Sequence, residues 1–219
     1  MPLPRADKEI CLAGPLADPL GSIAKLRAAR TRVTVTTEPD ESVLIGGVEK
    51  REIRIVDYDP AWPSKFDAHA RIIHGALRGS IVRVEHVGST SVPGLAAKPI
   101  VDILVAVPDS ANESAYLPQL EAAGYILRVR EPDWNEHRMF RTFDRDVHIH
   151  VFSAGCSEIQ RNLTFRERLR ASAEDRRRYE QVKRELAAQN WPDMNAYARA
   201  KTEVIESILA AAQAGEVSR

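Results

Sequence analysis

The sequence predicts an α/β (α+β) fold with a mixed β-sheet, flanking helices and a C-terminal helical cap. Three observations predict it. Between residues 52 and 152, short runs of β-branched and apolar residues alternate with helical patterns. The run over residues 100–107 is apolar except for one aspartate, which is typical of a strand buried on both faces. Residues 161–212 show helical spacing and no strand pattern.

The main domain is expected to begin with a strand over residues 52–58. Asp59 and Pro60 then suit the N-cap and the first position of a helix. Its apolar stripe has helical spacing and consists of Phe66, Ala70, Ile73 and Leu77. The sequence therefore predicts a helix that packs one face on the sheet.

The centre of the chain predicts two strands, a helix and a third strand. The strands cover residues 81–87 and 100–107, and a loop containing glycine and proline joins them. A helix is expected over residues 110–123, with Gly124 as the residue that ends it, followed by a strand over residues 125–130.

Two further strands and the helical cap complete the predicted body. Residues 137–143 and 147–152 flank Asp144-Arg145-Asp146, a polar turn typical of a hairpin. Residues 161–189 predict one long helix, which holds nine basic and five acidic residues. A Trp-Pro pair ends it, and a last helix is expected over residues 194–212.

Length and composition bound the organisation of the chain. Its 219 residues suit one sizeable domain, which we place at residues 51–213. Residues 1–50 are expected to form an appendage, partly flexible or a short hairpin that pairs residues 31–37 with 42–48. Residues 214–219 are expected to form a flexible tail.

Charge and apolar content narrow the partners and the compartment. The chain has 31 basic and 31 acidic residues, and this balance argues against nucleic acid as a partner. No window approaches the roughly 18 apolar residues of a membrane span. The two cysteines lie far apart, and the N-terminus lacks a secretory leader pattern. We therefore expect a cytoplasmic protein without a membrane partner.

A Gly-Ser-Thr turn at Gly88, Ser89 and Thr90 follows the strand predicted at residues 81–87. Glycine has no Cβ, so backbone N–H groups there can approach phosphate oxygens, and the two hydroxyl groups can assist. The alternative is an ordinary tight turn. Asp102 lies in the apolar strand that follows, where a carboxylate needs a partner such as a metal ion. The alternative is an aspartate at a strand edge.

His148 and His150 are two residues apart on a predicted strand and therefore point to one face. This geometry suits one metal ion or a phosphate, and the alternative is a packed histidine bonded to a backbone carbonyl. His86 ends the strand before the Gly-Ser turn and would face the same pocket if neighbouring strands align. Imidazole ligands favour Zn²⁺ or Mn²⁺ over Mg²⁺, and all three metals stay open.

Basic side chains supply candidates for phosphate binding. Lys98 is either a phosphate ligand or a solvated loop residue. Lys201 lies within the apolar stripe of its helix, so its ammonium group either reaches solvent or turns inward to Asp102 or a phosphate. Arg138 and Arg141 are three positions apart on a strand, so they point to opposite faces and only one can join the pocket.

Four motifs carry a family resemblance: Tyr58-Asp59-Pro60-Ala61-Trp62, the stretch His86-Val87-Gly88-Ser89-Thr90-Ser91-Val92-Pro93-Gly94-Leu95, then Lys98-Pro99-Ile100-Val101-Asp102-Ile103, and His148-Ile149-His150-Val151. Weaker matches lie at residues 165–170, Tyr197 and Lys201. With these motifs, residues 53–209 resemble the GrpB family of the DNA polymerase beta-like nucleotidyltransferase superfamily. The resemblance implies a nucleotidyltransferase-like sheet, a nucleoside triphosphate held by the Gly-Ser loop, and a divalent metal held by strand carboxylates.

One position departs from the superfamily pattern. Active transferases carry a second carboxylate two residues after the first, whereas Leu104 follows Asp102 here. Three readings stay open: transfer of a nucleotidyl group to an unknown small acceptor with Asp102 and Lys201 as catalytic residues, a non-catalytic nucleotide-binding or regulatory domain, and a protein-interaction module. GrpB-like domains also occur fused to dephospho-CoA kinase, which implies a link to coenzyme A metabolism. The chain has no kinase P-loop motif, so kinase activity is not expected.

Overall fold

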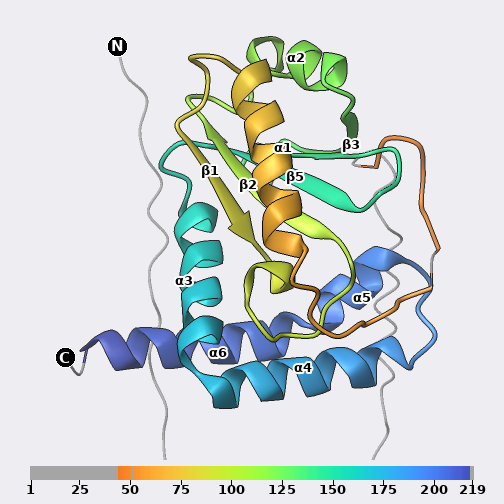
Figure 1. The fold of residues 1–219 in the computed structure, drawn as a ribbon, viewed down its shortest axis with the longest axis vertical. Coiled ribbons are helices and arrows are strands. Elements are labelled where there is room, and N and C mark those ends of the chain that lie inside the picture. The colour runs from red at the N-terminus through yellow and green to blue at the C-terminus, as the bar shows by residue number, and fades with distance from the viewer. Residues whose placement is uncertain (1–43, 51, 218–219) are drawn as a thin grey trace, which may run out of the picture. The chain divides into compact units, whose positions relative to one another are not determined.

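A computed structural model describes residues 44–50 and 52–217 of the chain. Its centre is a five-stranded mixed sheet in the order β1-β2-β5-β4-β3, in which only the β2–β5 pair is parallel among the described strands (Figure 1). The strands are β1 Arg83–Val87, β2 Val101–Val107, β3 Ile126–Glu131, β4 His137–Arg141 and β5 Val147–Ser153. The predicted α/β class and these five strands are confirmed.

Two helices cover one face of the sheet. They are α1, Trp62–Ala76, and the short α2, Leu117–Ala122, which follows a 3-10 turn at Glu113–Ala115. Their apolar residues and those of the strands form the largest core cluster. Helix α1 begins later than predicted, because the Asp59 carboxylate accepts a hydrogen bond from the Ala61 N–H at 2.8 Å in a turn before the helix.

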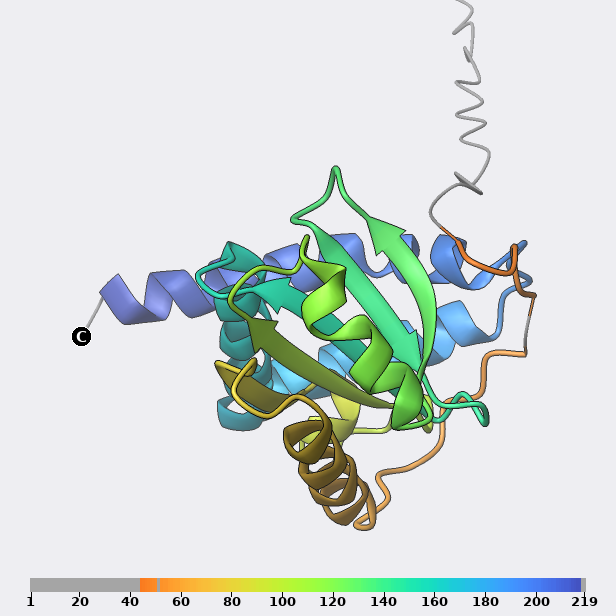
Figure 2. The same cartoon turned by 90° about the horizontal axis from the view of Figure 1, so that it is seen from above.

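Four helices form a second group, in which the first packs on the other face of the sheet and the other three pack with it and with one another (Figure 2). They are α3 Ser157–Ala171, α4 Ala173–Ala187, α5 Met194–Ala200 and α6 Thr202–Val217. The prediction of one helix over residues 161–189 is wrong. Ser172 has an extended backbone, and its hydroxyl group caps α4 by accepting from the Asp175 N–H at 3.1 Å. The last predicted helix is likewise divided, at Lys201.

Residues 44–49 are tied to the sheet. Leu44 bridges to Val129, and the Ile45 N–H donates to the Arg128 carbonyl oxygen at 2.9 Å. The Glu49 carboxylate accepts two hydrogen bonds of 2.9 Å from Arg141. The strand expected at residues 31–37 lies outside the described residues.

The stretch before α1 is largely irregular. Where a strand was predicted over residues 52–58, only Val56 forms a β-bridge, and its partner is Ala97. Within the described parts of the chain, none of the helices has the length and apolar character needed to cross a membrane.

The core allows a direct test of the fold. Phe140 is fully buried between the sheet and α2, so Phe140→Ala should lower the free energy of unfolding by about 3–5 kcal/mol. Phe143 is 82% exposed, and Phe143→Ala should change it by less than about 0.5 kcal/mol. Urea denaturation measures both values. Equal losses in the two variants would contradict the described packing.

Candidate functional site

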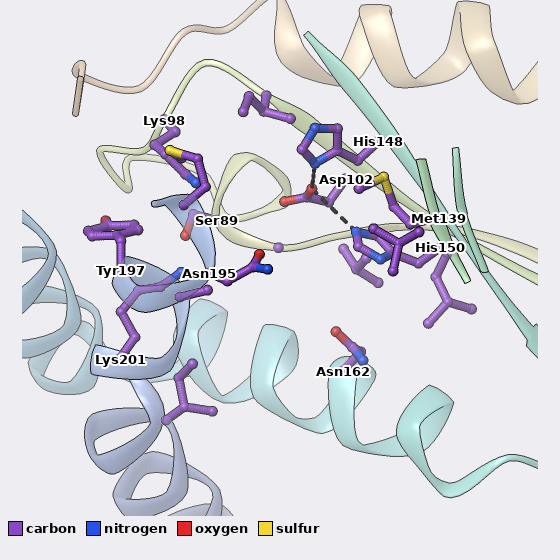
Figure 3. A pocket seen from close by; sticks show the side chains of 18 of the residues that line it. Ser89, Lys98, Asp102, Met139, His148, His150, Asn162, Asn195, Tyr197 and Lys201 are labelled. Carbon is purple, nitrogen blue, oxygen red and sulfur yellow. Dashed lines mark ion pairs between the residues drawn. The ribbon is translucent and has the colours of Figure 1, made fainter. Parts of the chain in front are cut away.

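A cavity of about 570 Å³ lies on the face of the sheet opposite α1 (Figure 3). Residues from β2, β4 and β5 line it on one side, and residues from α3, α4, α5 and α6 line it on the other. The side chains of Lys98, Tyr197 and Lys201 gather at one end, and Asp102 lies near the centre. The cavity thus joins segments that are about a hundred residues apart in the sequence.

The parallel pairing of β2 with β5 places the central groups. Asp102 is the register partner of His148, and Leu104 is the register partner of His150. The Asp102 Oδ1 atom lies 3.6 Å from His148 Nδ1 and 3.6 Å from His150 Nε2. Burial on its own would raise the pKa of Asp102, but hydrogen bonds and positive charge from His148 and His150, when their rings are protonated, outweigh burial and hold this pKa well below its ordinary value.

These three side chains have the donor set and the spacing of a metal site. One ligand atom from each lies within 4.8 Å of the other two. Two ligand atoms bound to one tetrahedral zinc ion at about 2.1 Å each are about 3.4 Å apart, close to the 3.6 Å seen here. Two imidazole nitrogens and one carboxylate oxygen suit Zn²⁺ or Mn²⁺ better than Mg²⁺.

His86 was expected in the same pocket, and this expectation is not met. In the β1–β2 ladder its partner is Ile103, so its side chain lies on the α1 face of the sheet. Its ring stacks on Phe66 with ring centroids 4.9 Å apart, and its Nε2 lies 3.1 Å from Thr90 Oγ1. Burial lowers the pKa of His86 to about 4. The structure therefore brings together three of the four predicted metal ligands.

The Gly88 turn lies directly against Asp102. Gly88 has φ 69°, and a Cβ atom at this position would overlap the Asp102 carboxylate. The Ser91 hydroxyl group donates to the Gly88 carbonyl oxygen at 2.6 Å, which closes the turn. Because Thr90 bonds to His86, the side chain of Ser89 is the one that extends toward the cavity (Figure 3).

Lys98 and Lys201 approach the same aromatic ring. Their ammonium nitrogens lie 5.1 and 5.0 Å from the centroid of Tyr197, within the range of a cation–π contact. Burial lowers the pKa of Lys201, and attraction to Asp102 offsets part of this effect. The inward orientation considered for Lys201 is the one observed.

Lys183 is a site residue that sequence reasoning missed. It is only 2% exposed, and its ammonium group donates to Ser89 Oγ at 3.1 Å and to the Ala96 carbonyl oxygen. Burial, and then the charge of Lys201, lower the pKa of Lys183 to about 7. The available signal was helical spacing, because Lys183 follows the buried Tyr179 by four residues on α4.

Arg138 and Arg141 point to opposite faces, as predicted. Arg138 donates to the Glu113 carboxylate at 2.6 Å on the α2 side, whereas Arg141 lines the cavity and binds Glu49. Both guanidinium groups already have carboxylate partners. Arg141 therefore contributes to the wall of the pocket more than to its free positive charge, and Arg138 lies outside it.

The Gly88 turn yields a matched pair of variants. Gly94 also has a positive φ of 77°, but a Cβ there would meet nothing within 4 Å. Gly94→Ala should therefore cost only backbone strain, on the order of 1–3 kcal/mol. Gly88→Ala should lower stability further in thermal unfolding, since it also displaces the Asp102 carboxylate. A smaller loss for Gly88→Ala than for Gly94→Ala would contradict this geometry.

Comparison with known proteins identifies the family of this chain. The family model described as GrpB protein matches residues 52–211. The UPF0157 protein SCO7215 of Streptomyces coelicolor is 53% identical over 181 residues, which cover 83% of this chain and 93% of that protein.

Two further relatives extend the comparison. A dephospho-CoA kinase of Mycolicibacterium paratuberculosis is 28% identical, over 70% of this chain and 44% of the kinase. The crystal structure of conserved protein GrpB from Enterococcus faecalis matches with a TM-score of 0.65 and 32% identity, and covers 73% of this chain and 96% of that one. The match to the family model and the 53% identity to a relative together show that this chain belongs to the GrpB family.

Proposed function

We propose that the cavity binds a nucleoside triphosphate together with a divalent cation and transfers its nucleotidyl group to a small acceptor. The observation that carries this proposal is the convergence of one carboxylate and two imidazoles beside the Gly88 turn, with three lysines at the same cavity. The carboxylate side suits a cation, and the lysine side suits a polyphosphate. Such a pair of neighbouring charges is what a nucleotide bound to a metal presents.

The lysines favour an anionic ligand on electrostatic grounds. Lys98 and Lys201 both lower the pKa of Lys183, which means that each of them repels the Lys183 ammonium group. A phosphate group among them would replace this repulsion with attraction. Lys183 also orients the Ser89 hydroxyl group, which lies at the turn where phosphate oxygens can approach.

Asp102, His148 and His150 would hold the cation in this proposal. A bound divalent cation supplies Lewis-acid polarisation of a phosphoryl oxygen and neutralises its charge. In the transfer, an acceptor hydroxyl oxygen forms a bond to the α-phosphorus while the bond from the α-phosphorus to the oxygen that bridges to the β-phosphorus breaks. Pyrophosphate leaves, and the hydroxyl proton of the acceptor passes to solvent. Lys201 and Lys98 would bind and orient the negatively charged phosphate groups.

A second candidate is nucleotide binding without transfer, in a regulatory domain. Leu104 favours it, because this fully buried side chain occupies the position of the second carboxylate and packs with Val87, Ala106 and Phe152. Two-metal chemistry needs two bridging carboxylates, and β2 supplies one. The similarity to a dephospho-CoA kinase supports a link of either candidate to coenzyme A metabolism.

Asp102→Asn tests the cation site that both candidates share, and pyrophosphate release by the wild type separates the candidates. Wild-type protein with ATP and Mn²⁺ should show a raised melting temperature and release pyrophosphate when an acceptor is present. Asp102→Asn should lose both effects, since the neutral amide is a weak cation ligand. The matched control Asp144→Asn changes an exposed aspartate in the β4–β5 turn and should behave as wild type.

The pattern of outcomes assigns the function. Metal-dependent stabilisation without pyrophosphate release across a panel of acceptors supports the regulatory candidate. Absence of any metal-dependent nucleotide binding by the wild-type protein contradicts both candidates.

The binding of polyphosphate should depend on pH through Lys183. Burial and the charges of Lys201, Arg184 and Lys98 hold the pKa of this lysine at about 7, although Glu180 acts in the opposite direction. A bound anion raises this pKa, so binding above pH 7 must take up a proton. The affinity for tripolyphosphate should therefore fall, by up to about tenfold per pH unit, as the pH rises above 7.

Calorimetry in two buffers with different ionisation enthalpies measures this proton uptake directly. Lys183→Met should bind tripolyphosphate more weakly and lose most of the uptake. Arg177→Gln removes an exposed positive charge on α4 and should leave the uptake unchanged. Equal proton uptake by wild type and Lys183→Met would refute the role of this lysine.

A further inference from the structure

We propose that Glu131 and His137 are positioning residues, which hold His150 in the tautomer whose Nε2 atom is free to bind the cation. The inference rests on the proposed function, since the metal site is part of it. Neither residue is one of the three candidate metal ligands. The sequence motifs did not point to either of them. They reach the site through a chain of hydrogen bonds that runs behind His150.

The chain consists of three short contacts. Glu131 Oε2 lies 2.6 Å from His137 Nδ1, and His137 Nε2 lies 3.1 Å from His150 Nδ1. The other ring nitrogen of His150, Nε2, faces Asp102 Oδ1 at 3.6 Å. The three residues come from neighbouring strands, because Glu131 ends β3, His137 begins β4 and His150 lies in β5.

Donor and acceptor roles follow from the end of this chain. A carboxylate only accepts hydrogen bonds, so the proton between Glu131 and His137 lies on His137 Nδ1. In a neutral His137 ring, Nε2 is then an acceptor, and the proton it receives comes from His150 Nδ1. The neutral His150 ring is left with a lone pair on Nε2, directed at the Asp102 carboxylate.

This tautomer favours a cation at the end of the chain. A nitrogen lone pair and a carboxylate oxygen that face each other at 3.6 Å repel, and a cation between them turns both into ligands. A histidine that binds a metal through one ring nitrogen characteristically donates its other N–H to such a partner, which fixes the ring and its tautomer. Glu131 and His137 provide that partner in two steps.

Packing around His137 keeps the chain in place. The ring is 5% exposed and stacks on Phe152, with centroids 4.7 Å apart. It also lies nearly parallel to the ring of His150, at 14°, and the edge of Trp134 contacts it. A ring held on these sides has little freedom to flip and exchange its two nitrogens. The turn between β3 and β4 thus supports His150 from the wall of the same cavity.

The tautomer can be measured in the metal-free protein. Nitrogen–proton correlation NMR at a pH of about 8.5, well above the ordinary histidine pKa of about 6.5, reports which ring nitrogen is protonated. We expect His150 to carry its proton on Nδ1 in the wild type, and to lose this preference in His137→Phe. A wild-type His150 protonated on Nε2, or no change in His137→Phe, would overturn the inference.

Affinity for Co²⁺ supplies the second readout, followed by calorimetry and by its visible absorption bands. His137→Phe keeps the aromatic stacking and removes the hydrogen bond, so it should bind Co²⁺ about 10–100-fold more weakly. His137→Gln offers an amide oxygen that can accept from His150 and should recover most of the affinity. Phe143→Ala changes an exposed side chain beyond the end of β4 and should stay close to wild type.

These outcomes separate the inference from the proposed function. If the wild type binds Co²⁺ and His137→Phe binds it equally well, the inference fails and the metal site stands. If neither the wild type nor Asp102→Asn binds Co²⁺, the proposed metal site fails, and the inference fails with it. The NMR result then shows whether the hydrogen-bond chain exists as a purely structural feature.

Discussion

The parallel ladder between β2 and β5 is the constraint on which the site depends. It places Asp102 beside His148 and Leu104 beside His150, and it directs all four side chains to the face away from α1. A half-buried carboxylate in an apolar strand is costly unless it has partners, and this ladder supplies two imidazoles that can share a cation with it. A shift of β5 by one residue would turn both histidines into the opposite core.

The surrounding elements serve this arrangement from two sides. Gly88 lacks a Cβ, so the backbone of the turn can lie against the Asp102 carboxylate. On the far side of the cavity, α4 and the junction of α5 with α6 bring Lys183 and Lys201 inward. Burial lowers the pKa of both lysines, because their ammonium groups have lost contact with water. The attraction of an anionic ligand would offset this cost. Sheet and helices therefore contribute opposite charges to one cavity.

The sequence allowed much of this to be predicted, but only where the signal was local. Apolar runs located the five strands, and the two-residue spacing correctly placed His148 and His150 on one face. His86 was expected in the pocket but lies on the other face of the sheet. The face to which a strand residue points depends on the register with the neighbouring strand, and His86 of β1 pairs with Ile103 of β2. The helix break at Ser172 was missed because a serine N-cap inside a charged helical pattern is indistinguishable from a surface serine. Lys183 was missed among eight other basic residues of that pattern.

The central claim is that Asp102, His148 and His150 bind one divalent cation in this GrpB-family protein. Anomalous diffraction from crystals grown with Co²⁺ and a non-hydrolysable nucleoside triphosphate tests it most directly. The account predicts one cobalt peak within bonding distance of Asp102 Oδ1, His148 Nδ1 and His150 Nε2, with phosphate density on the side of Lys183. Cobalt bound elsewhere, or nucleotide bound in this cavity with no metal between the three side chains, would contradict it.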